Sequence, residues 1–408
     1  MSIATNPLIV VADRFWDGIA DRPSGRTSVL VAGGRVEEVG PTRTRGAEVV
    51  DLGDRTLVPG FIDCHVHVVP DLPPDTSVSA QTLAALTSLR TLLHNGFTTV
   101  RDLGCAPPSV TVDLKQAQRE GVVDGPRMIV APRIISGRGG HGDKSAGLGE
   151  RFGVELGALA DGVDEVVQAV RVEARQGADW IKFAGTGGFG SEHDDPELVT
   201  YSQAEVDALV ATARDLGMPT AVHAFNDEGV LRAAHAGVRS VEHASLATPS
   251  TLTVLVDKGI WLVPTQFVTV ECLRHLDDDD FWTDKPDHLR DTFRTHADRL
   301  HQCATHPAGS AARIAFGSDA SVLPHRDNWR EFPTMVSNGI SELRALRAAT
   351  SEAAALLATP DRGTIRPGAL ADLVAMPGNP FEDIGCTGNV DFVMQNGHIK
   401  RHAHPDVR

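Results

Sequence analysis

The sequence predicts an α/β protein whose central part is a (β/α)₈ barrel and whose two ends are rich in β-strands. Between residues 57 and 317, short apolar runs alternate with stretches that have apolar residues at helical spacing. The apolar runs lie at 57–67, 97–101, 128–135, 180–184, 219–223, 240–243, 260–264 and 314–317. Strand–helix units in such a series are typical of a closed barrel of parallel strands.

The helical stretches between these runs end at glycines, which are common helix stop signals. Three of them, 163–176, 203–216 and 228–236, are followed by Gly177, Gly217 and Gly237. The same alternation leaves an open, doubly wound sheet as the alternative. Neither a GxGxxG motif nor a P-loop follows the first two predicted strands, and this weakens that alternative.

Both ends of the chain carry strand and turn patterns. Residues 29–32 and 35–39 flank Gly33-Gly34, and this pattern predicts a β-hairpin. Near the other end, residues 371–376 and 391–394 are strand-like, and Asn396-Gly397 predicts a turn before a return strand.

The composition excludes several classes of function. The chain has 408 residues, of which 41% are hydrophobic, and it carries a formal net charge of -16. This charge argues against nucleic acid or an anionic membrane as a partner, and the expected partner is a small-molecule substrate. Homo-oligomerisation is left open.

The chain also lacks the usual patterns of export. No apolar run approaches the ~20 residues that a membrane span needs, and the first residues lack a signal-peptide pattern. Five scattered cysteines and no CxxC pair indicate neither a disulfide framework nor a cysteine zinc site. We therefore expect a cytoplasmic protein.

Polar residues that bind metals lie at or near the carboxyl ends of the predicted strands. They are His65, His67, Lys182, His223, His243 and Asp319. The carboxyl ends of barrel strands meet at one face, so these side chains are expected to converge there. Each histidine alone is more simply a core or surface residue, but the combination favours a metal site.

The spacing of His65 and His67 fits two ligands of one ion. Residues i and i+2 of a strand point to the same face, so both imidazoles are expected to point into the site. Neutral imidazole and carboxylate suit Zn²⁺ and related divalent ions.

Lys182 lies within an apolar strand, where burial favours the neutral amine. Three interpretations stay open from the residues alone. The amine could add CO₂ and become a carbamate that bridges two ions, it could pair with a carboxylate such as Asp102, or it could form a Schiff base.

Several motifs resemble those of the amidohydrolase superfamily over essentially the whole chain. They are Gly60–His67, which resembles PGxIDxHxH, Val241–Ala244, Phe316–Ala320 and Gly363–Val374. The resemblance implies a (β/α)₈ TIM barrel at 57–357 joined to a small β-sandwich made from 1–56 and 358–408. Within the superfamily, residues 97–103, 125–127, 139–143 and 178–182 resemble Xaa-Pro and Xaa-Arg/Lys dipeptidases and ochratoxin-hydrolysing amidases.

This group implies a centre with two metal ions bridged by carboxylated Lys182. By motif matching, His65, His67 and Asp319 would bind the first ion, and His223 and His243 the second, with Zn²⁺ the expected metal. The group usually has His-Ala-His-Gly after strand five, where this chain has His223-Ala224-Phe225-Asn226. The change spares the metal ligand but removes one imidazole from the site.

The expected reaction is hydrolysis of a linear amide, a dipeptide or an N-acyl amino acid. A water shared by two ions would be a hydroxide at neutral pH, and Asp319 would act as general base and then as general acid. In the glycine-rich loop after strand three, His141 is a candidate catalytic and substrate-binding residue.

Further candidates for holding a substrate carboxylate are Arg138, Tyr201, His325 and Arg326. Tyr201 is equally well explained as a packing residue beside Ser202, a predicted helix N-cap. The acidic run Asp277–Asp280 is predicted to be a solvated loop that could form part of a lid after strand seven.

Three other functions compete with linear amide hydrolysis. Deaminases of the superfamily mostly use one metal and lack the strand-four lysine, so Lys182 argues against them. Cyclic-amide or lactone hydrolases are the nearest alternative, because ring substrates need no carboxylate contact. A non-catalytic scaffold would have lost metal ligands, whereas all of the ligand positions are filled here.

Overall fold

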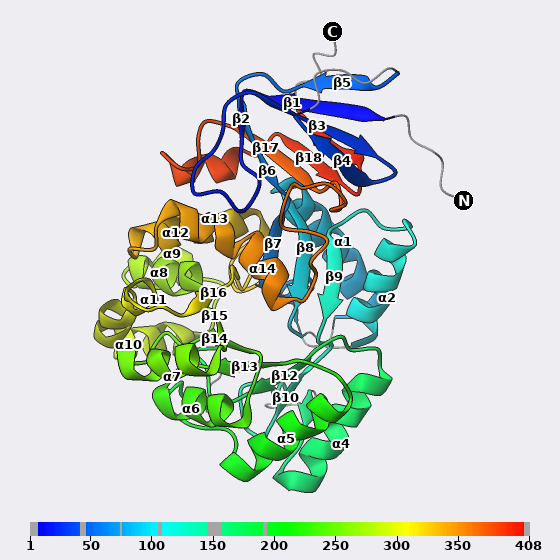
Figure 1. Cartoon of the computed structure of the whole chain (residues 1–408). Helices are drawn as coiled ribbons and strands as arrows, with labels where there is room; N and C mark the ends of the chain where they lie inside the picture. Colours follow the sequence, from blue (N-terminus) through cyan, green and yellow to red (C-terminus); the bar gives the residue numbers. More distant parts are fainter. Residues whose placement is uncertain are drawn as a thin grey trace.

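Strands from both ends of the chain form two sheets on one side of the molecule (Figure 1). The computed structural model describes residues 7–40, 46–73, 76–104, 108–145, 157–190 and 194–403. The terminal strands are β1 (Leu8–Ala12), β2 (Arg14–Phe15), β3 (Thr27–Ala32), β4 (Arg35–Val39), β5 (Glu48–Asp51), β6 (Arg55–Pro59), β17 (Leu373–Pro377), β18 (Phe392–Gln395) and β19 (His398–His402). One sheet has the order β4-β3-β1-β5, and the other has the order β19-β18-β17-β6-β2.

The predicted hairpin is confirmed, and its turn explains the two glycines. β3 and β4 pair in antiparallel fashion, and Gly33 and Gly34 between them have φ angles of 56° and 79°. A buried apolar cluster includes Val10 and Val31 from the first sheet and Leu373 and Phe392 from the second. Residues from both ends of the chain therefore share one core.

The central part of the chain supplies parallel strands, and the α/β class that the sequence predicts is confirmed. These strands are β7 (Phe61–Val66), β8 (Phe97–Asp102), β9 (Arg127–Val130), β10 (Ile134–Ser136), β11 (Ala158–Leu159), β12 (Ile181–Ala184), β13 (Thr220–Ala224), β14 (Ser240–His243), β15 (Trp261–Val263) and β16 (Arg313–Ile314). They form two sheets with the orders β7-β8-β9 and β11-β10-β12-β13-β14-β15-β16.

Backbone hydrogen bonds also connect these two parallel sheets to each other. The carbonyl of Val130, at the end of β9, accepts from the N–H groups of Asp179 and Trp180 just before β12, at 2.8 and 3.2 Å. On the other side, the Cys64 N–H of β7 donates to Phe316 O after β16, at 2.8 Å. The sheet β7-β8-β9 is therefore joined at β9 to the segment before β12 and at β7 to the segment after β16.

Helices pack outside the strands (Figure 1). They are α1 (Val78–His94), α2 (Pro108–Arg119), α4 (Gly162–Arg175), α5 (Gln203–Asp215), α6 (Asp227–Ala236), α7 (Pro249–Lys258), α8 (Gln266–Arg274), α9 (Asp279–Trp282), α10 (Asp287–Cys303), α11 (His306–Gly309), α12 (Glu331–Ser337), α13 (Glu342–Ala348) and α14 (Ser351–Leu356), with 3₁₀ helices η1 (His325–Arg330) and η2 (Ile384–Asn389). The three helical stretches predicted from the sequence are confirmed as α4, α5 and α6. Gly177, Gly217 and Gly237 follow them with φ angles of 95°, 71° and 86°.

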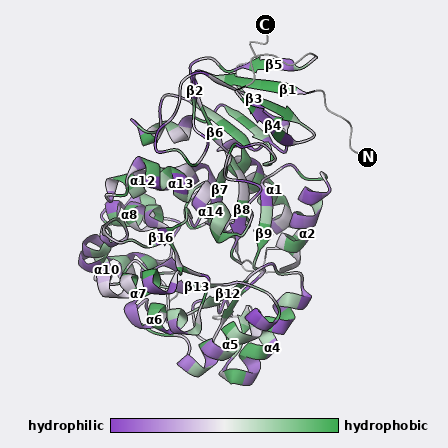
Figure 2. Cartoon of the chain, viewed as in Figure 1, coloured by the Kyte–Doolittle hydropathy of each residue, from purple (hydrophilic) through white to green (hydrophobic). Residues whose placement is uncertain are grey.

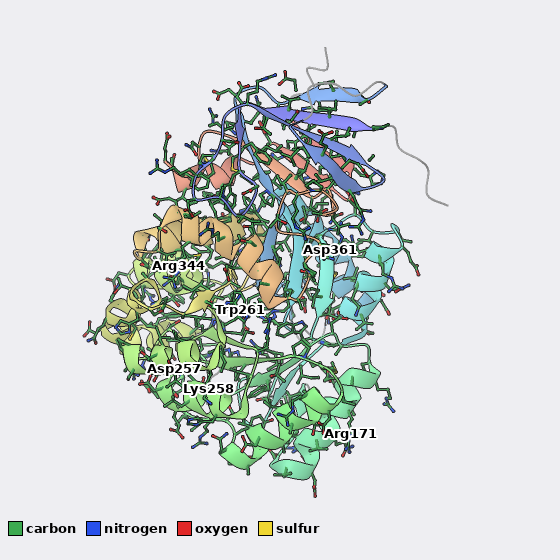
Figure 3. All side chains as sticks on the ribbon, in the orientation of Figure 1. Arg171, Asp257, Lys258, Trp261, Arg344 and Asp361 are labelled. Carbon is green, nitrogen blue, oxygen red and sulfur yellow. The ribbon has the colours of Figure 1, made fainter. Side chains whose placement is uncertain are left out.

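The outer helices and the inner strands differ in polarity. Figure 2 shows purple, hydrophilic stretches along the helices, whereas β12 and β13 are mostly green. In Figure 3, Asp257 and Lys258 lie on α7 and Arg171 on α4, while Trp261 of β15 lies inside the molecule. Trp261 is fully buried.

The acidic run Asp277–Asp280 is not wholly a loop, which corrects the prediction. All four residues are exposed, but Asp279 and Asp280 form the first turn of α9. The Asp278 side chain accepts a hydrogen bond from Phe281 N, so this aspartate is the N-cap of α9.

Two further findings concern the chain as a whole. Cys64, Cys272, Cys303 and Cys386 are buried and form no disulfide, and Cys105 lies outside the described residues. In the part of the chain that the structure describes, no helix combines the length and the apolar character needed to cross a bilayer.

Candidate metal centre

Three predicted ligands meet at the carboxyl ends of the strands. His65 of β7, His243 of β14 and Asp319 beyond β16 each offer a ligand atom, and these atoms all lie within 4.8 Å of one another. All three residues are buried. The segment that carries Asp319 is fixed to β7, because its N–H donates to His65 O at 2.8 Å.

His67 joins this group through the same carboxylate. Its Nε2 lies 3.2 Å from Asp319 Oδ1, and Nε2 of His65 lies at the same distance from that oxygen. His65 lies in β7 and His67 directly follows this strand, so the two imidazoles face one carboxylate oxygen, as expected from the alternation of extended backbone.

His223 and Lys182 complete the set of six. The His223 ring, at the end of β13, lies 4.6 Å from the His243 ring. Lys182 is 1% exposed on the neighbouring strand β12 and interacts electrostatically with Asp319, His223 and His243. The structure thus brings all six predicted ligands together.

The Lys182 amine is buried and has no hydrogen-bond partner among the residues that the structure describes. Burial is the main cause that lowers the pKa of Lys182, to about 8. The carboxylate of Asp102, an alternative partner, instead accepts from the N–H groups of Val68 and Gly104, at 2.7 and 3.1 Å. A buried primary amine without an acceptor is an unsatisfied polar group in the centre of the site.

Each of the four histidines uses one ring nitrogen for a contact with the protein. These contacts join His65 Nδ1 to Glu242 Oε2 (2.9 Å), His67 Nδ1 to Gly104 O (2.7 Å), His223 Nε2 to Gly187 O (3.2 Å), and His243 Nδ1 to Thr265 Oγ1 (2.7 Å). Such contacts fix the tautomer and the orientation of a metal-binding imidazole. The other nitrogen of each ring is then left as a candidate ligand.

These features fit a site for divalent cations. Burial lowers the pKa values of His223 and His243 well below that of free histidine, so both rings are neutral at pH 7. Although burial raises the pKa of Asp319, the neighbouring His65 outweighs it and keeps this carboxyl ionised. Neutral imidazoles and a carboxylate suit Zn²⁺ and related ions, and the lowered pKa of Lys182 makes its neutral, carbamate-forming state more accessible.

A buried ion-pair network behind the centre was missed by the sequence analysis. Glu242 contacts His65 on one oxygen, and its other oxygen accepts from Arg101 Nη2 at 2.9 Å and from Ser240 Oγ at 2.5 Å. Burial raises the pKa of Glu242, but Arg101 and His65 overcome this effect and lower it to about 2. The guanidinium of Arg101 also lies 4.4 Å above the Trp180 ring.

The backbone is left-handed at two of the ligands. His243 and Asp319 have φ angles of 70° and 54°, which side chains with a Cβ rarely adopt. Such conformations are found most often where the surrounding structure holds a functional group in place.

Aromatic side chains pack beside His223 and His243. The Phe225 ring stacks on His243 with 4.8 Å between centroids and meets His223 edge-on at 4.9 Å. Behind it, Phe189 contacts Phe225 and stacks on Phe293 of α10. The departure from the group's histidine at this position therefore places an apolar surface against the centre.

His141, a predicted catalytic and substrate-binding residue, lies beside the candidate ligand His223. Its ring stacks on His223 with 4.0 Å between centroids and 10° between planes. Burial, followed by the neighbouring His223, lowers the pKa of His141 well below its ordinary value. A neutral imidazole in this position can donate a hydrogen bond to a carbonyl or a carboxylate.

The other predicted substrate contacts lie elsewhere. Arg138 forms exposed ion pairs with Asp161 and Glu165, at 2.7 and 3.1 Å. Buried Tyr201 donates its hydroxyl to Ala160 O at 3.0 Å, next to Ser202, which caps α5 as predicted.

The two predicted substrate contacts in the loop after strand eight, His325 and Arg326, also have other surroundings. His325 Nε2 donates to His67 O at 2.8 Å, so its ring supports β7. The Arg326 side chain is 78% exposed. Neither side chain is therefore placed to bind the carboxylate of a substrate.

Comparisons with known proteins agree with this geometry. A model of the amidohydrolase family matches residues 56–400. The chain is 30% identical over 356 residues to ochratoxinase of Aspergillus niger, a match that covers 80% of this chain and 71% of ochratoxinase.

Solved structures match over nearly the full length. A Xaa-Pro dipeptidase with methionine bound in its active site has a TM-score of 0.90 and 32% identity, covering 97% of this chain and 100% of that one. A prolidase in complex with N-methylphosphonate-L-proline has a TM-score of 0.87 and 29% identity, with coverage of 97% and 100%.

The contact between Thr265 and His243 predicts a loss of metal affinity in Thr265→Val. The substitution keeps the shape but removes the oxygen that orients the ring, and changes of this kind cost about 10- to 100-fold in affinity. Competition with a chromophoric chelator measures the effect. Thr334→Val, which removes a hydroxyl bonded to Arg330 O on α12, is the matched control and should bind metal as the parent does.

Tyr201→Phe should lower stability and leave catalysis unchanged. The variant leaves Ala160 O without its donor, at a cost of about 1 kcal/mol. Thermal unfolding and steady-state kinetics test this together. A raised KM at unchanged melting temperature would instead place Tyr201 in the substrate site.

Proposed function

This chain belongs to the amidohydrolase family, in the group of Xaa-Pro dipeptidases and ochratoxinase, and is therefore a hydrolase that acts on amide bonds. We propose that it hydrolyses these bonds with two divalent metal ions. Zn²⁺ is the metal that we propose for the native enzyme, on the chemistry of the donor set. The substrate that we propose is a linear amide, either a dipeptide or an N-acyl amino acid.

One observation carries the binuclear proposal: the buried amine of Lys182 has no hydrogen-bond partner among the described residues and interacts with His223, His243 and Asp319. A neutral amine can take up CO₂, and the resulting carbamate has two oxygens, enough to bridge two ions. His65, His67 and Asp319 would then hold one ion, and His223 and His243 the other. Six donors exceed what one tetrahedral ion can use.

Two ions at this centre would supply an activated water and a polarised amide carbonyl. The residues of the chain handle protons and position the substrate. Asp319 is ionised and faces His65 and His67, so it can accept a proton and pass it to the leaving nitrogen. His141 can donate to the substrate carbonyl or carboxylate, and Phe225 excludes bulk water from the side of His243.

The same proposal covers the architecture. We propose that residues 57–357 form a (β/α)₈ barrel. Its eight strands would be β7, β8, β9 together with β10 as one interrupted strand, and β12–β16, and the two parallel sheets are hydrogen-bonded to each other. Residues 1–56 and 358–408 would form the β-sandwich, apart from 1–6, 41–45 and 404–408, which lie outside the described residues.

Two relatives support a substrate with a carboxylate on the leaving group. The prolidase structure holds N-methylphosphonate-L-proline, and the Xaa-Pro dipeptidase holds methionine. Cyclic amides or lactones are the second candidate, and the structure provides an argument for them. Arg138 and His325 are engaged in other contacts, and Phe225 presents no polar group to a carboxylate.

We predict near two equivalents of metal per chain after growth with Zn²⁺, measured by elemental analysis. Lys182→Ala should lose bound metal, because it removes the proposed bridge. Lys258→Ala, on the exposed end of α7, is the control and should keep the full content. A parent protein that holds one equivalent under saturating metal would contradict the binuclear proposal.

Amidation of the substrate's terminal carboxylate should lower kcat/KM by one to two decades. A hydrogen bond to a charged group contributes ~1.5–3 kcal/mol, and His141 is the proposed donor. The comparison uses a dipeptide and its C-terminal amide. If both are inert while a neutral cyclic amide or lactone turns over, the second candidate replaces the first.

A further inference from the structure

A loop after β12 brings Asp194 close to the candidate centre. Its described residues on either side of 191–193 are joined by backbone hydrogen bonds: Gly188 N donates to Asp194 O at 2.9 Å, and Gly187 N donates to Leu198 O at 3.0 Å. Asp194 is therefore held beside the Gly187–Gly188 segment, which continues directly from the strand of Lys182.

The Gly187–Gly188 segment also contacts the centre. Gly187 O accepts from His223 Nε2 at 3.2 Å. A Cβ on Gly188 would lie 2.3 Å from His141 Nδ1, and a Cβ on Gly187 would lie 2.4 Å from Asp194 Oδ1. Both glycines are thus needed for close packing, and this one segment touches Asp194 and the two stacked histidines.

Among the described residues, the Asp194 carboxyl group has no hydrogen-bond donor. The residue is 6% exposed, and Oδ2 is buried without a hydrogen bond. Lys144, which follows His141 in the strand-three loop, interacts with it electrostatically, but the two form no ion pair among the described residues. Burial, helped by Asp195, raises the pKa of Asp194 to about 6. A buried carboxylate in this state favours a ligand that brings hydrogen-bond donors and positive charge.

We propose that Asp194 binds the free α-ammonium group of the substrate. This inference rests on the proposed function and deepens it, because it selects a dipeptide over an N-acyl amino acid. The α-nitrogen lies about 2.5 Å from the scissile carbonyl carbon by standard backbone dimensions. An ammonium bound at Asp194 therefore fixes that carbonyl close to the histidines, and such positioning contributes much of the rate of an enzyme.

The test compares a dipeptide with its N-acetyl derivative on the metal-loaded enzyme. Asp194→Asn removes the charge and keeps the shape, and it should lower kcat/KM for the free dipeptide about 10- to 100-fold while leaving the acetylated substrate unchanged. Asp195→Asn is the matched control: Asp195 is the neighbouring acid, 45% exposed, and contacts His296 at 3.2 Å. It should preserve the preference for the free amine.

A binding measurement gives a second readout that does not depend on turnover. Calorimetry with L-methionine and N-acetyl-L-methionine should show that Asp194→Asn weakens only the former. If the variant weakens both equally, or if Asp195→Asn has the same effect, the proposal is overturned. A wild-type protein that hydrolyses no linear amide but binds L-methionine through Asp194 would contradict the proposed function alone.

Lys144 supplies the remaining control. If Lys144 and Asp194 form a purely structural pair, Lys144→Gln should reproduce the loss seen in Asp194→Asn, and this result would also overturn the proposal. We expect instead that Lys144→Gln keeps the preference for the free amine, because the substrate ammonium and not the lysine is the partner of Asp194. Melting temperatures of all variants exclude unfolding as the cause.

Discussion

The gathering of four imidazoles, a carboxylate and an amine, all but His67 buried, is the constraint on which the rest of the structure depends. Polar groups inside a protein are costly unless each has a partner, and the Lys182 amine has no hydrogen-bond partner in the part of the chain that the structure describes. His65 and His67 face Asp319 Oδ1 with their Nε2 atoms, and the Nδ1 atom of each ring already contacts another oxygen, in Glu242 and in Gly104. Divalent cations would relieve this arrangement, because every one of these groups is a ligand.

Supporting contacts keep the ligands in place when no ion holds them. Glu242, Thr265 and two backbone carbonyls each fix one imidazole, and the Arg101–Glu242 pair is itself buried and fully bonded. Removing one partner of such a pair leaves an uncompensated charge, so the network couples the folding of β8 and β14 to the geometry of the site. Asp63 works in the same way: it accepts from the backbone of His65 and from both the backbone and the hydroxyl of Ser318.

Much of the fold and of the centre could be predicted from the sequence, because strand ends, helix stops and ligand spacing are local patterns. The alternation of side chains on a strand was enough to predict that His65 and His67 point to the same side. Helical spacing and a following glycine were enough to predict α4, α5 and α6. Contacts between distant segments could not be read in this way. No local sequence pattern predicts the contact of Thr265 with His243 or the ion pair of Arg138 with Asp161. The packing of Asp194 against Gly187 is equally invisible to such patterns. Glu242 left a weak signal, as a carboxylate inside an apolar strand next to a predicted ligand.

The most direct test of the account concerns the state of Lys182. Metal-loaded protein is equilibrated with ¹³C-labelled bicarbonate and its ¹³C NMR spectrum is recorded. The account predicts a carbamate resonance that is present in the parent protein, absent in Lys182→Ala and unaffected in Lys258→Ala. A fully metal-loaded parent protein without this resonance would show that the lysine stays an amine, and the bridged binuclear centre would then be wrong.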